Sequence, residues 1–447
     1  MNEYLVYGTA SSDPKNPGLF AISTVRRVKP FKTFKQNGTL ANRTVVLDSC
    51  ILSAQADRPL IYVYGITKEA PVQKIVLPEK LSCITATRSG KFLAAGTQTG
   101  KLILWELGSG ACLIYKEIHY GSVTSIVFSA DDAVLFSAGA DSRIYSWRTF
   151  DLCTMGMNLN ELKPLAGATQ HSLEITGLYC GYGGALDSRL YSISRDSSCR
   201  VWDASDLKLY TTYVFEEPLC SIVVDPAERA IYVGGESGVI YHVDLYRSTS
   251  NGSIEYNGGL QRTVSVSSDS NSMFSGHSGK ILALALTFDA TMLVSGSEDG
   301  SVIVWDIATH QSLNVNRLGR GPVHSVNVLP KLPSEDLLPL ESFKFLSEES
   351  YGSTHQSWMQ IPDLTDDETS CTFSIANLTE TPIVSSTTTG PSAESQKPTS
   401  EIQTKETDDY KAKFERVSAA YDKLWKEHTA MLEAANDDAD DEDEDDN

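Results

Sequence analysis

The chain has 447 residues, of which 41% are hydrophobic, and its 37 basic and 58 acidic side chains give a formal net charge of −21. This composition is typical of a soluble globular protein with tails, and it argues against a surface that binds phosphates over its whole extent. No apolar stretch reaches the roughly 18 residues of a membrane span, and the N-terminus lacks the basic and apolar regions of a signal peptide. We therefore expect a cytosolic or nuclear protein, with buried free thiols because the eight cysteines form no CxxC pair.

The N-terminal region contains two strand-like stretches, residues 4–9 and 19–25, followed by the only cationic cluster of the chain. That cluster runs from Arg26 to Lys35 in the sequence RRVKPFKTFK. An RNA contact or a weak nuclear signal is one interpretation of it. The preferred interpretation is a solvated loop between strands.

A repeat organises the residues that follow, as far as residue 330. Each unit has two strand-like apolar runs, a turn of Gly, Ser and Asp, and a third run in which apolar residues alternate. Most intervals between units match the 40–45 residues of a propeller blade, and two longer intervals contain inserts. The third run ends in Trp in four units and is degenerate in two: Trp105, Trp147, Trp202 and Trp305, with Tyr64 and Val243.

Three units carry a fuller pattern, in which a His begins the unit and a Ser and an Asp precede the Trp. This pattern resembles the WD-repeat family, in which the four residues form a hydrogen-bonded network within a blade. Such a network is satisfied only as a complete set. The units ending at Trp105 and Val243 lack the Asp, and we expect them to be less rigidly specified. The complete sets are His119, Ser137, Asp141, Trp147; His171, Ser192, Asp196, Trp202; and His277, Ser295, Asp299, Trp305.

The resemblance predicts an all-β fold, a β-propeller over residues 1–330. Six units are visible, and residues 322–326 look like the inner strand of a seventh blade. We expect the N-terminal strands to complete that blade, because closure removes the exposed sheet edges. Six closed blades is the alternative.

Two inserts and a linker interrupt or follow the propeller. Residues 247–275 are rich in Ser, Asn and Gly and are assigned to the blade ending at Trp305, and residues 151–170 form a shorter insert. Residues 331–406 are expected to be an extended arm that ends in a linker, residues 380–406, rich in Ser, Thr and Pro. The linker has too little apolar content to fold.

The C-terminal region changes to a helical pattern over residues 407–435. Its apolar positions follow a 4-3 spacing, which is typical of a coiled-coil seam and predicts self-association rather than docking on its own propeller. Residues 436–447 form an acidic tail that is expected to be disordered, and it either attracts basic partners or only solvates the end. The seam residues are Tyr410, Phe414, Val417, Tyr421, Leu424, His428 and Met431.

The sequence gives no support for catalysis. The Ser-His-Asp sets look like hydrolase triads, but they recur with every complete repeat and accompany a Trp, so we interpret them as structural. The motifs G-x-S-x-G, GxxxxGK[ST] and HExxH do not occur. The His and Cys residues have no metal-ligand spacing. We therefore predict no enzyme activity, no cofactor and no metal site.

The combination of GTQTGKLILWELGSG, HYGSVTSIVFSADDAVLFSAGADSRIYSW and a C-terminal YDKLWKEHTAML helix resembles one family more closely. It is similar to the WD-repeat subunit of the rixosome, a family of pre-rRNA-processing WD-repeat proteins. The likeness covers roughly residues 1–330 and 407–432.

This resemblance implies a non-enzymatic scaffold in the nucleus, in both nucleoplasm and nucleolus. The complex would remove the second internal transcribed spacer during assembly of the large ribosomal subunit. Implied partners are the other rixosome subunits, pre-60S particles, a dynein-like AAA ATPase and a second copy of the chain bound through the C-terminal helix. The family is also linked to replication licensing and to silent chromatin. The competing hypothesis is a chromatin adaptor or ubiquitin-ligase substrate receptor that reads basic tails in the propeller channel.

Overall fold

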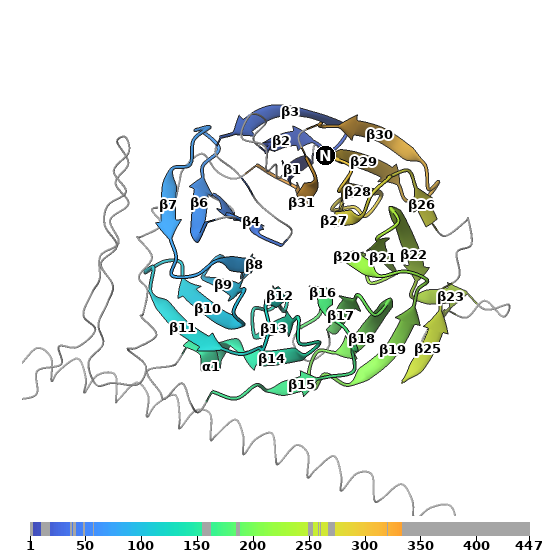
Figure 1. The fold of residues 1–447 in the computed structure, drawn as a ribbon. Coiled ribbons are helices and arrows are strands. Elements are labelled where there is room, and N and C mark those ends of the chain that lie inside the picture. The colour runs from blue at the N-terminus through green and yellow to red at the C-terminus, as the bar shows by residue number, and fades with distance from the viewer. Residues whose placement is uncertain are drawn as a thin grey trace, which may run out of the picture. The chain divides into compact units, whose positions relative to one another are not determined.

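The computed structural model describes residues 3–9, 18–35, 38, 42–47, 50–56, 58–153, 162–184, 188–248, 254–257, 259, 261–266, 273–319 and 321–332. These residues form seven sheets of four or five strands arranged in a ring, and one edge strand of each sheet faces the central channel (Figure 1). The seven-bladed WD-repeat propeller is therefore confirmed. The six-bladed alternative is wrong.

Each blade is a sheet whose strands run in order from the central channel to the rim. From the innermost strand outward, blade 1 is β31 (Val323–Leu329), β1 (Tyr4–Thr9), β2 (Phe20–Thr24) and β3 (Arg27–Phe34), and blade 2 is β4 (Thr44–Val46), β5 (Ile51–Ala54), β6 (Leu60–Tyr64) and β7 (Gln73–Val76). Blade 3 is β8 (Leu81–Ala86), β9 (Phe92–Thr97), β10 (Lys101–Glu106) and β11 (Cys112–Glu117), and blade 4 is β12 (Val123–Phe128), β13 (Val134–Gly139), β14 (Ile144–Arg148) and β15 (Ala166–Ala168).

The remaining blades follow the same order. Blade 5 is β16 (Ile175–Cys180), β17 (Arg189–Ser194), β18 (Ser198–Asp203), β19 (Leu209–Val214) and β25 (Arg262–Ser265), and blade 6 is β20 (Leu219–Val224), β21 (Ala230–Gly235), β22 (Val239–Asp244) and β26 (Met273–Ser275). Blade 7 is β27 (Ile281–Leu286), β28 (Met292–Ser297), β29 (Ser301–Asp306) and β30 (Ser312–Arg317). A helix, α1 (Thr149–Cys153), follows β14, and β23 (Tyr246–Ser248) pairs with β24 (Ile254–Tyr256).

The core lies between neighbouring blades rather than at the centre of the ring. Phe274 of blade 6, for example, packs in one cluster with Leu293 and Trp305 of blade 7. Because each middle strand is covered on both faces, the middle strands are buried along almost their whole length, as in β28 and β29. Trp105 and Trp202 are fully buried in such clusters.

The ring closes through strands from both ends of the described chain. β1 pairs antiparallel with β31, so that the N-terminal strands and the last described strand share blade 1. This mixed closure is the one predicted from residues 4–9, 19–25 and 322–326. It covers the edge of β1 that faces the channel, which would otherwise be open to pairing with another chain.

The insert at residues 247–275 pairs differently from the prediction, which assigned it to the blade ending at Trp305. Its strand β26 is the outer strand of blade 6, and β25 adds a parallel fifth strand to blade 5. Blade 7 receives none of the described insert strands, since its outer strand is β30. The shorter insert similarly supplies α1 and β15, the outer strand of blade 4.

The cationic stretch that begins at Arg26 forms strand β3 and not the loop that was predicted. Its side chains alternate between exposed and covered positions, as expected of a strand on the rim of a blade. Pro30 is compatible with this strand because β3 is the outermost strand of its sheet, where a missing N–H is tolerated.

The predictions about cysteines and membrane spans are compared here with the described residues alone. The seven cysteines within the described residues are free thiols, four of them buried and three half-buried, so the predicted burial holds for only part of them. Within the same part of the chain, no helix is long and apolar enough to cross a membrane. The predicted arm and linker, residues 331–406, lie outside the described residues apart from 331 and 332. The predicted helix, with all seven seam residues from Tyr410 to Met431, and the predicted acidic tail also lie outside them.

Candidate functional site

The structure brings the four members of each predicted Ser-His-Asp-Trp set together. In blade 4, Trp147 Nε1 donates to Ser137 Oγ at 3.1 Å, and that oxygen lies 3.0 Å from His119 Nε2. The other ring nitrogen, Nδ1, lies 3.0 Å from Asp141 Oδ1. The contacts fit one chain of donors, from indole to hydroxyl to imidazole to carboxylate. These hydrogen bonds connect the loop before the first strand of the blade, which carries His119, to the second and third strands, which carry Ser137 and Trp147.

The other two complete sets repeat this geometry. Ser192 lies 2.8 Å from Trp202 Nε1 and 2.7 Å from His171 Nε2, and Asp196 lies 3.0 Å from His171 Nδ1. In blade 7 the distances are 2.8 Å for Trp305 to Ser295, 2.7 Å for Ser295 to His277 and 3.3 Å for His277 to Asp299. A third partner, Ser301 Oγ, lies 2.9 Å from His277 Nδ1.

Burial keeps the networks of blades 5 and 7 in one protonation state. It lowers the pKa of His171 and of His277, which favours the neutral ring that accepts from Ser. Burial alone would raise the pKa of Asp299, but hydrogen bonds from Ser301 and two backbone amides hold it at about 2. Hydrogen bonds from His171 and Ser198 likewise lower the pKa of Asp196 against the effect of burial. Asp196 and Asp299 are therefore ionised, and the rings of His171 and His277 are neutral, at physiological pH.

The same burial prevents hydrolase chemistry at the three serines. Ser137, Ser192 and Ser295 are fully buried, and each hydroxyl oxygen already accepts the indole N–H of its Trp. A nucleophile must reach a substrate carbonyl with a free lone pair. The geometry thus supports a network that ties strands together and leaves the serines no access to a substrate.

The two units that lack the Asp contain other networks, which the repeat pattern did not reveal. In blade 3, Glu79 accepts from Lys101 Nζ and from the Tyr115 hydroxyl, both at 2.8 Å, and it also accepts from Thr99. In blade 6, Glu217 accepts from Ser237 Oγ at 2.7 Å and from Tyr241 at 3.0 Å. In both blades the carboxylate comes from the loop that supplies His elsewhere, so these blades are also cross-linked.

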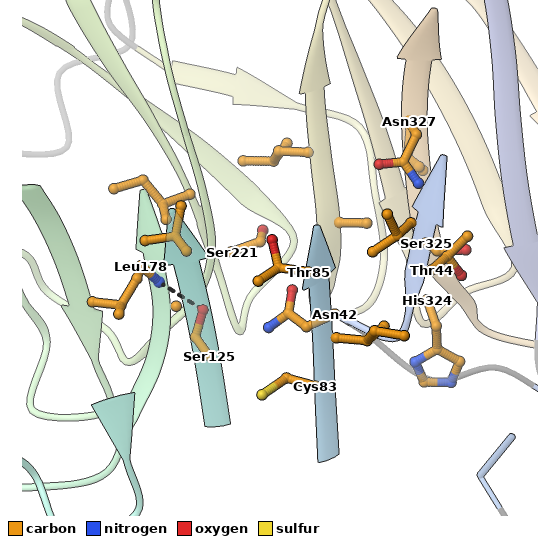
Figure 2. Close-up of a pocket in the computed structure, with 18 of the residues that line it drawn as sticks. Asn42, Thr44, Cys83, Thr85, Ser125, Leu178, Ser221, His324, Ser325 and Asn327 are labelled. Atoms are coloured by element: carbon orange, nitrogen blue, oxygen red, sulfur yellow. Dashed lines mark hydrogen bonds between the residues drawn. The ribbon is translucent and has the colours of Figure 1, made fainter. Parts of the chain in front are cut away.

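The central channel contains a cavity of about 360 Å³, lined by the inner strands of all seven blades (Figure 2). No charged residue and no Phe, Tyr or Trp lines it among the described residues. The polar residues around it are Asn42, Thr44, Thr85, Ser125, Thr176, Ser221, His324, Ser325 and Asn327.

Several of these hydroxyls join neighbouring inner strands across the blade boundaries. Ser125 Oγ accepts from Leu178 N at 3.2 Å, Thr176 donates to Leu219 O at 2.8 Å, and Ser221 donates to Ile281 O at 2.9 Å. Figure 2 shows the first of these bonds as a dashed line. The bonds link blades 4, 5, 6 and 7 in turn, so these side chains have a structural role that the repeat pattern did not show.

Comparison with known proteins places the chain in a family. The model of the WD domain, G-beta repeat, matches residues 110–148 and 267–306. A pre-rRNA-processing protein IPI3 of Yarrowia lipolytica is 34% identical over 357 residues, which are 77% of this chain and 80% of the relative. The chain belongs to the IPI3 family of pre-rRNA-processing proteins.

Two other members of this group extend the likeness beyond one organism. The pre-rRNA-processing protein crb3/ipi3 of Schizosaccharomyces pombe is 33% identical over 63% of this chain and 68% of the relative. The human WD repeat-containing protein 18 is 27% identical over 68% of this chain and 69% of the relative. The matched WD segments end in blades 4 and 7, which both contain a complete network.

Proposed function

We propose that this chain is a non-enzymatic scaffold subunit of a nuclear complex that processes pre-rRNA. The observation that carries the proposal is membership of the IPI3 family, whose relatives are named for pre-rRNA processing. We infer more specifically that the complex acts in removal of the second internal transcribed spacer and in assembly of the large ribosomal subunit. A location in nucleoplasm and nucleolus follows from that substrate.

The scaffold role is supported by the geometry of the blades. The serines of the three Ser-His-Asp sets are buried and hydrogen-bonded within blades. The outer strands instead provide a wide rim of sheet edge, with exposed apolar residues such as Leu313 and Val315 on β30. Exposed apolar side chains on a rigid rim favour binding of other proteins.

The proposed partners are the other subunits of the complex, pre-60S particles and a dynein-like AAA ATPase that remodels them. We also propose that two copies of the chain associate through the C-terminal seam, residues 410–431. A helix of that length is marginal alone and is stabilised by a partner. We propose replication licensing and silent chromatin as two further processes in which the same complex acts.

Depletion of the chain in its own cells, followed by RNA blotting with probes against the second internal transcribed spacer, tests the proposal. We expect precursors that contain the spacer to accumulate and to disappear when wild-type protein is restored. Ser192→Ala should restore processing in proportion to its protein level, because the hydroxyl is structural. Unchanged precursors after depletion would overturn the processing role, and a Ser192→Ala protein present at normal level without activity would overturn the non-enzymatic role.

The competing function, a receptor that reads basic tails in the channel, predicts acidic and aromatic residues at the binding surface. None of the described residues around the channel cavity is acidic or has a Phe, Tyr or Trp side chain. Affinity purification with mass spectrometry distinguishes the two functions. Large-subunit assembly factors support the scaffold, and histone-modifying or ubiquitin-ligase subunits support the receptor.

A further inference from the structure

Positive charge is concentrated in the first two blades of this acidic protein. Residues 18–77 contain nine basic and three acidic side chains, a net charge of +6, while the whole chain carries −21. The remainder of the chain therefore has a net charge of −27. Such asymmetry gives blades 1 and 2 a local potential opposite to that of the rest of the molecule. The basic residues are Arg26, Arg27, Lys29, Lys32, Lys35, Arg43, Arg58, Lys68 and Lys74.

Strand β3 presents part of this charge in a regular line on the rim of blade 1. Alternate residues from 27 to 35 are exposed: Arg27, Lys29, Phe31, Thr33 and Lys35. We refer to these five as the β3 stripe. Successive members are about 6.7 Å apart along an extended strand, so the stripe extends over roughly 27 Å. Phe31, which is 56% exposed, interrupts the cations with an aromatic ring that lies edge-on to Tyr4.

The stripe borders a groove of about 730 Å³ between β3 and the neighbouring outer strand, β30. Figure 1 shows these two strands next to each other on the outer rim of the ring. The side-chain amide of Asn316 donates to Val28 O at 2.7 Å and fixes the spacing of the strands. Arg27, Lys29 and Arg317 line the groove, and none of the described lining residues is acidic.

The cations of the groove are free to bind an external anion. In this region Lys35 forms an ion pair with Glu69 at 3.1 Å, and Lys32 donates to Thr67 O. Arg27, Lys29 and Arg317 form no ion pair with any described residue. Three unpaired cations around one groove repel each other, and a bound polyanion would relieve that repulsion.

We propose that the β3 stripe and its groove bind single-stranded RNA. Arg27, Lys29 and Arg317 contact successive phosphates, and a base stacks on Phe31. Cations at alternate strand positions match a backbone with regularly repeated charge, and an exposed aromatic ring among them is the usual platform for an unpaired base. The carboxylates of an acidic protein segment would pair with the cations but would not stack on the ring, so RNA is the preferred ligand. The inference rests on the proposed function in pre-rRNA processing, which supplies the class of ligand.

Fluorescence anisotropy with the purified full-length chain and a labelled single-stranded oligoribonucleotide, at several salt concentrations, tests the proposal. Arg27→Glu combined with Lys29→Glu should weaken binding. The plot of the logarithm of the association constant against the logarithm of the salt concentration should become less steep by about 1.4, since each phosphate contact with a single strand contributes about 0.7. Phe31→Ala should weaken binding at least about fivefold, the lower end for one base on an aromatic ring. Unchanged thermal melting should show that these exposed substitutions leave the propeller folded.

A charge-matched control is Lys91→Glu combined with Lys163→Glu, at two exposed positions on other blades. Equal losses in the two double variants would overturn the proposal, because they would mean that only net charge matters. Binding of poly-glutamate but not RNA at the stripe, with no effect of Phe31→Ala, would overturn it in favour of an acidic protein ligand. Absence of RNA binding together with precursor accumulation after depletion would overturn this inference alone and leave the processing role intact.

Discussion

Tyr7 in the first described strand lies directly opposite Val326 in the last, and both side chains are buried in one cluster with residues of blade 7. The pairing joins the two ends of the propeller. The ring is therefore held at this point by a sheet contact between distant segments, whereas every other blade takes its inner three strands from one continuous stretch of chain.

Val326→Asp should destabilise the propeller by at least about 3 kcal/mol, because it places a carboxylate without a partner in the closing cluster. Thermal and denaturant unfolding of the full chain measure the change. Val315→Asp is the matched control, since Val315 is 50% exposed on an outer strand and should lose less than about 1 kcal/mol. Similar losses in the two variants would contradict a closing role for the β1–β31 pair.

Trp305→Ala should cost about 3–5 kcal/mol, because it removes a buried aromatic ring and the donor to Ser295. Trp305→Phe retains most of the packing and isolates the loss of the hydrogen bond, which should cost about 1–2 kcal/mol. Denaturant unfolding monitored by circular dichroism gives both values. Melting of both variants close to wild type would show that the four-residue set does not stabilise the blade.

Asp141→Ala should be more destabilising than Asp299→Ala, although both carboxylates hold a His. His277 retains Ser301 Oγ at 2.9 Å when Asp299 is lost, while the position equivalent to Ser301 in blade 4 is Arg143. We expect a cost of about 1–3 kcal/mol for Asp141→Ala and about 1 kcal/mol less for Asp299→Ala. The reverse order in unfolding experiments would rule out this compensation.

The stability of the ring should fall in mild acid. Burial, with a smaller contribution from Arg43, lowers the pKa of His324 to about 4 from an ordinary value near 6.5. The unfolded chain thus takes up this proton more readily, so the stabilisation is complete above about pH 6.5 and is lost as the pH falls toward 4. Melting temperatures across this range should decline less steeply in His324→Gln than in wild type. Parallel profiles would mean that His324 does not contribute to the acid sensitivity.

Self-association should depend on the predicted seam. Tyr421→Asp combined with Leu424→Asp places charges at two seam positions and should give a monomer with an intact propeller. Light scattering measures the mass, and circular dichroism checks the fold. Lys426→Asp, at a position off the seam, is the control and should leave the mass unchanged. A double variant with the wild-type mass, or a monomeric wild type, would remove the proposed dimer.

The spacing of Trp, His, Ser and Asp was sufficient to predict the propeller, because these residues recur with the period of a blade. Its closure was predicted from the strand-like residues 4–9, 19–25 and 322–326, which had no complete unit of their own. The pattern did not predict the contacts of Glu79 and Glu217, since each lies in a loop that differs from its counterparts in sequence. It also misassigned β25 and β26. Strand partners of an irregular insert depend on which outer edges remain unpaired, and that is a property of the assembled ring.

The hydroxyl contacts in the channel show a second reason why the sequence pattern did not predict some contacts of the structure. Ser125 and Ser221 occupy ordinary strand positions, and their partners Leu178 and Ile281 belong to the next blade. A periodic pattern describes each blade by itself and contains no information on contacts between blades. The loop predicted for residues 26–35 was also wrong. The high charge of the stretch suggested that it is surrounded by solvent, but in an outer strand only alternate side chains are exposed to solvent.

The closing pair also sets an order of events during synthesis. β1 leaves the ribosome long before β31, and at 5–20 residues per second the roughly 320 residues between them correspond to a delay of about 15–60 s. Throughout that interval the inner edge of β1 has backbone donors and acceptors without a strand beside them, which is the condition that promotes pairing with other nascent chains. A translation stop before residue 323 would release a molecule with this edge permanently open, and such products should be degraded instead of persisting as six-bladed rings.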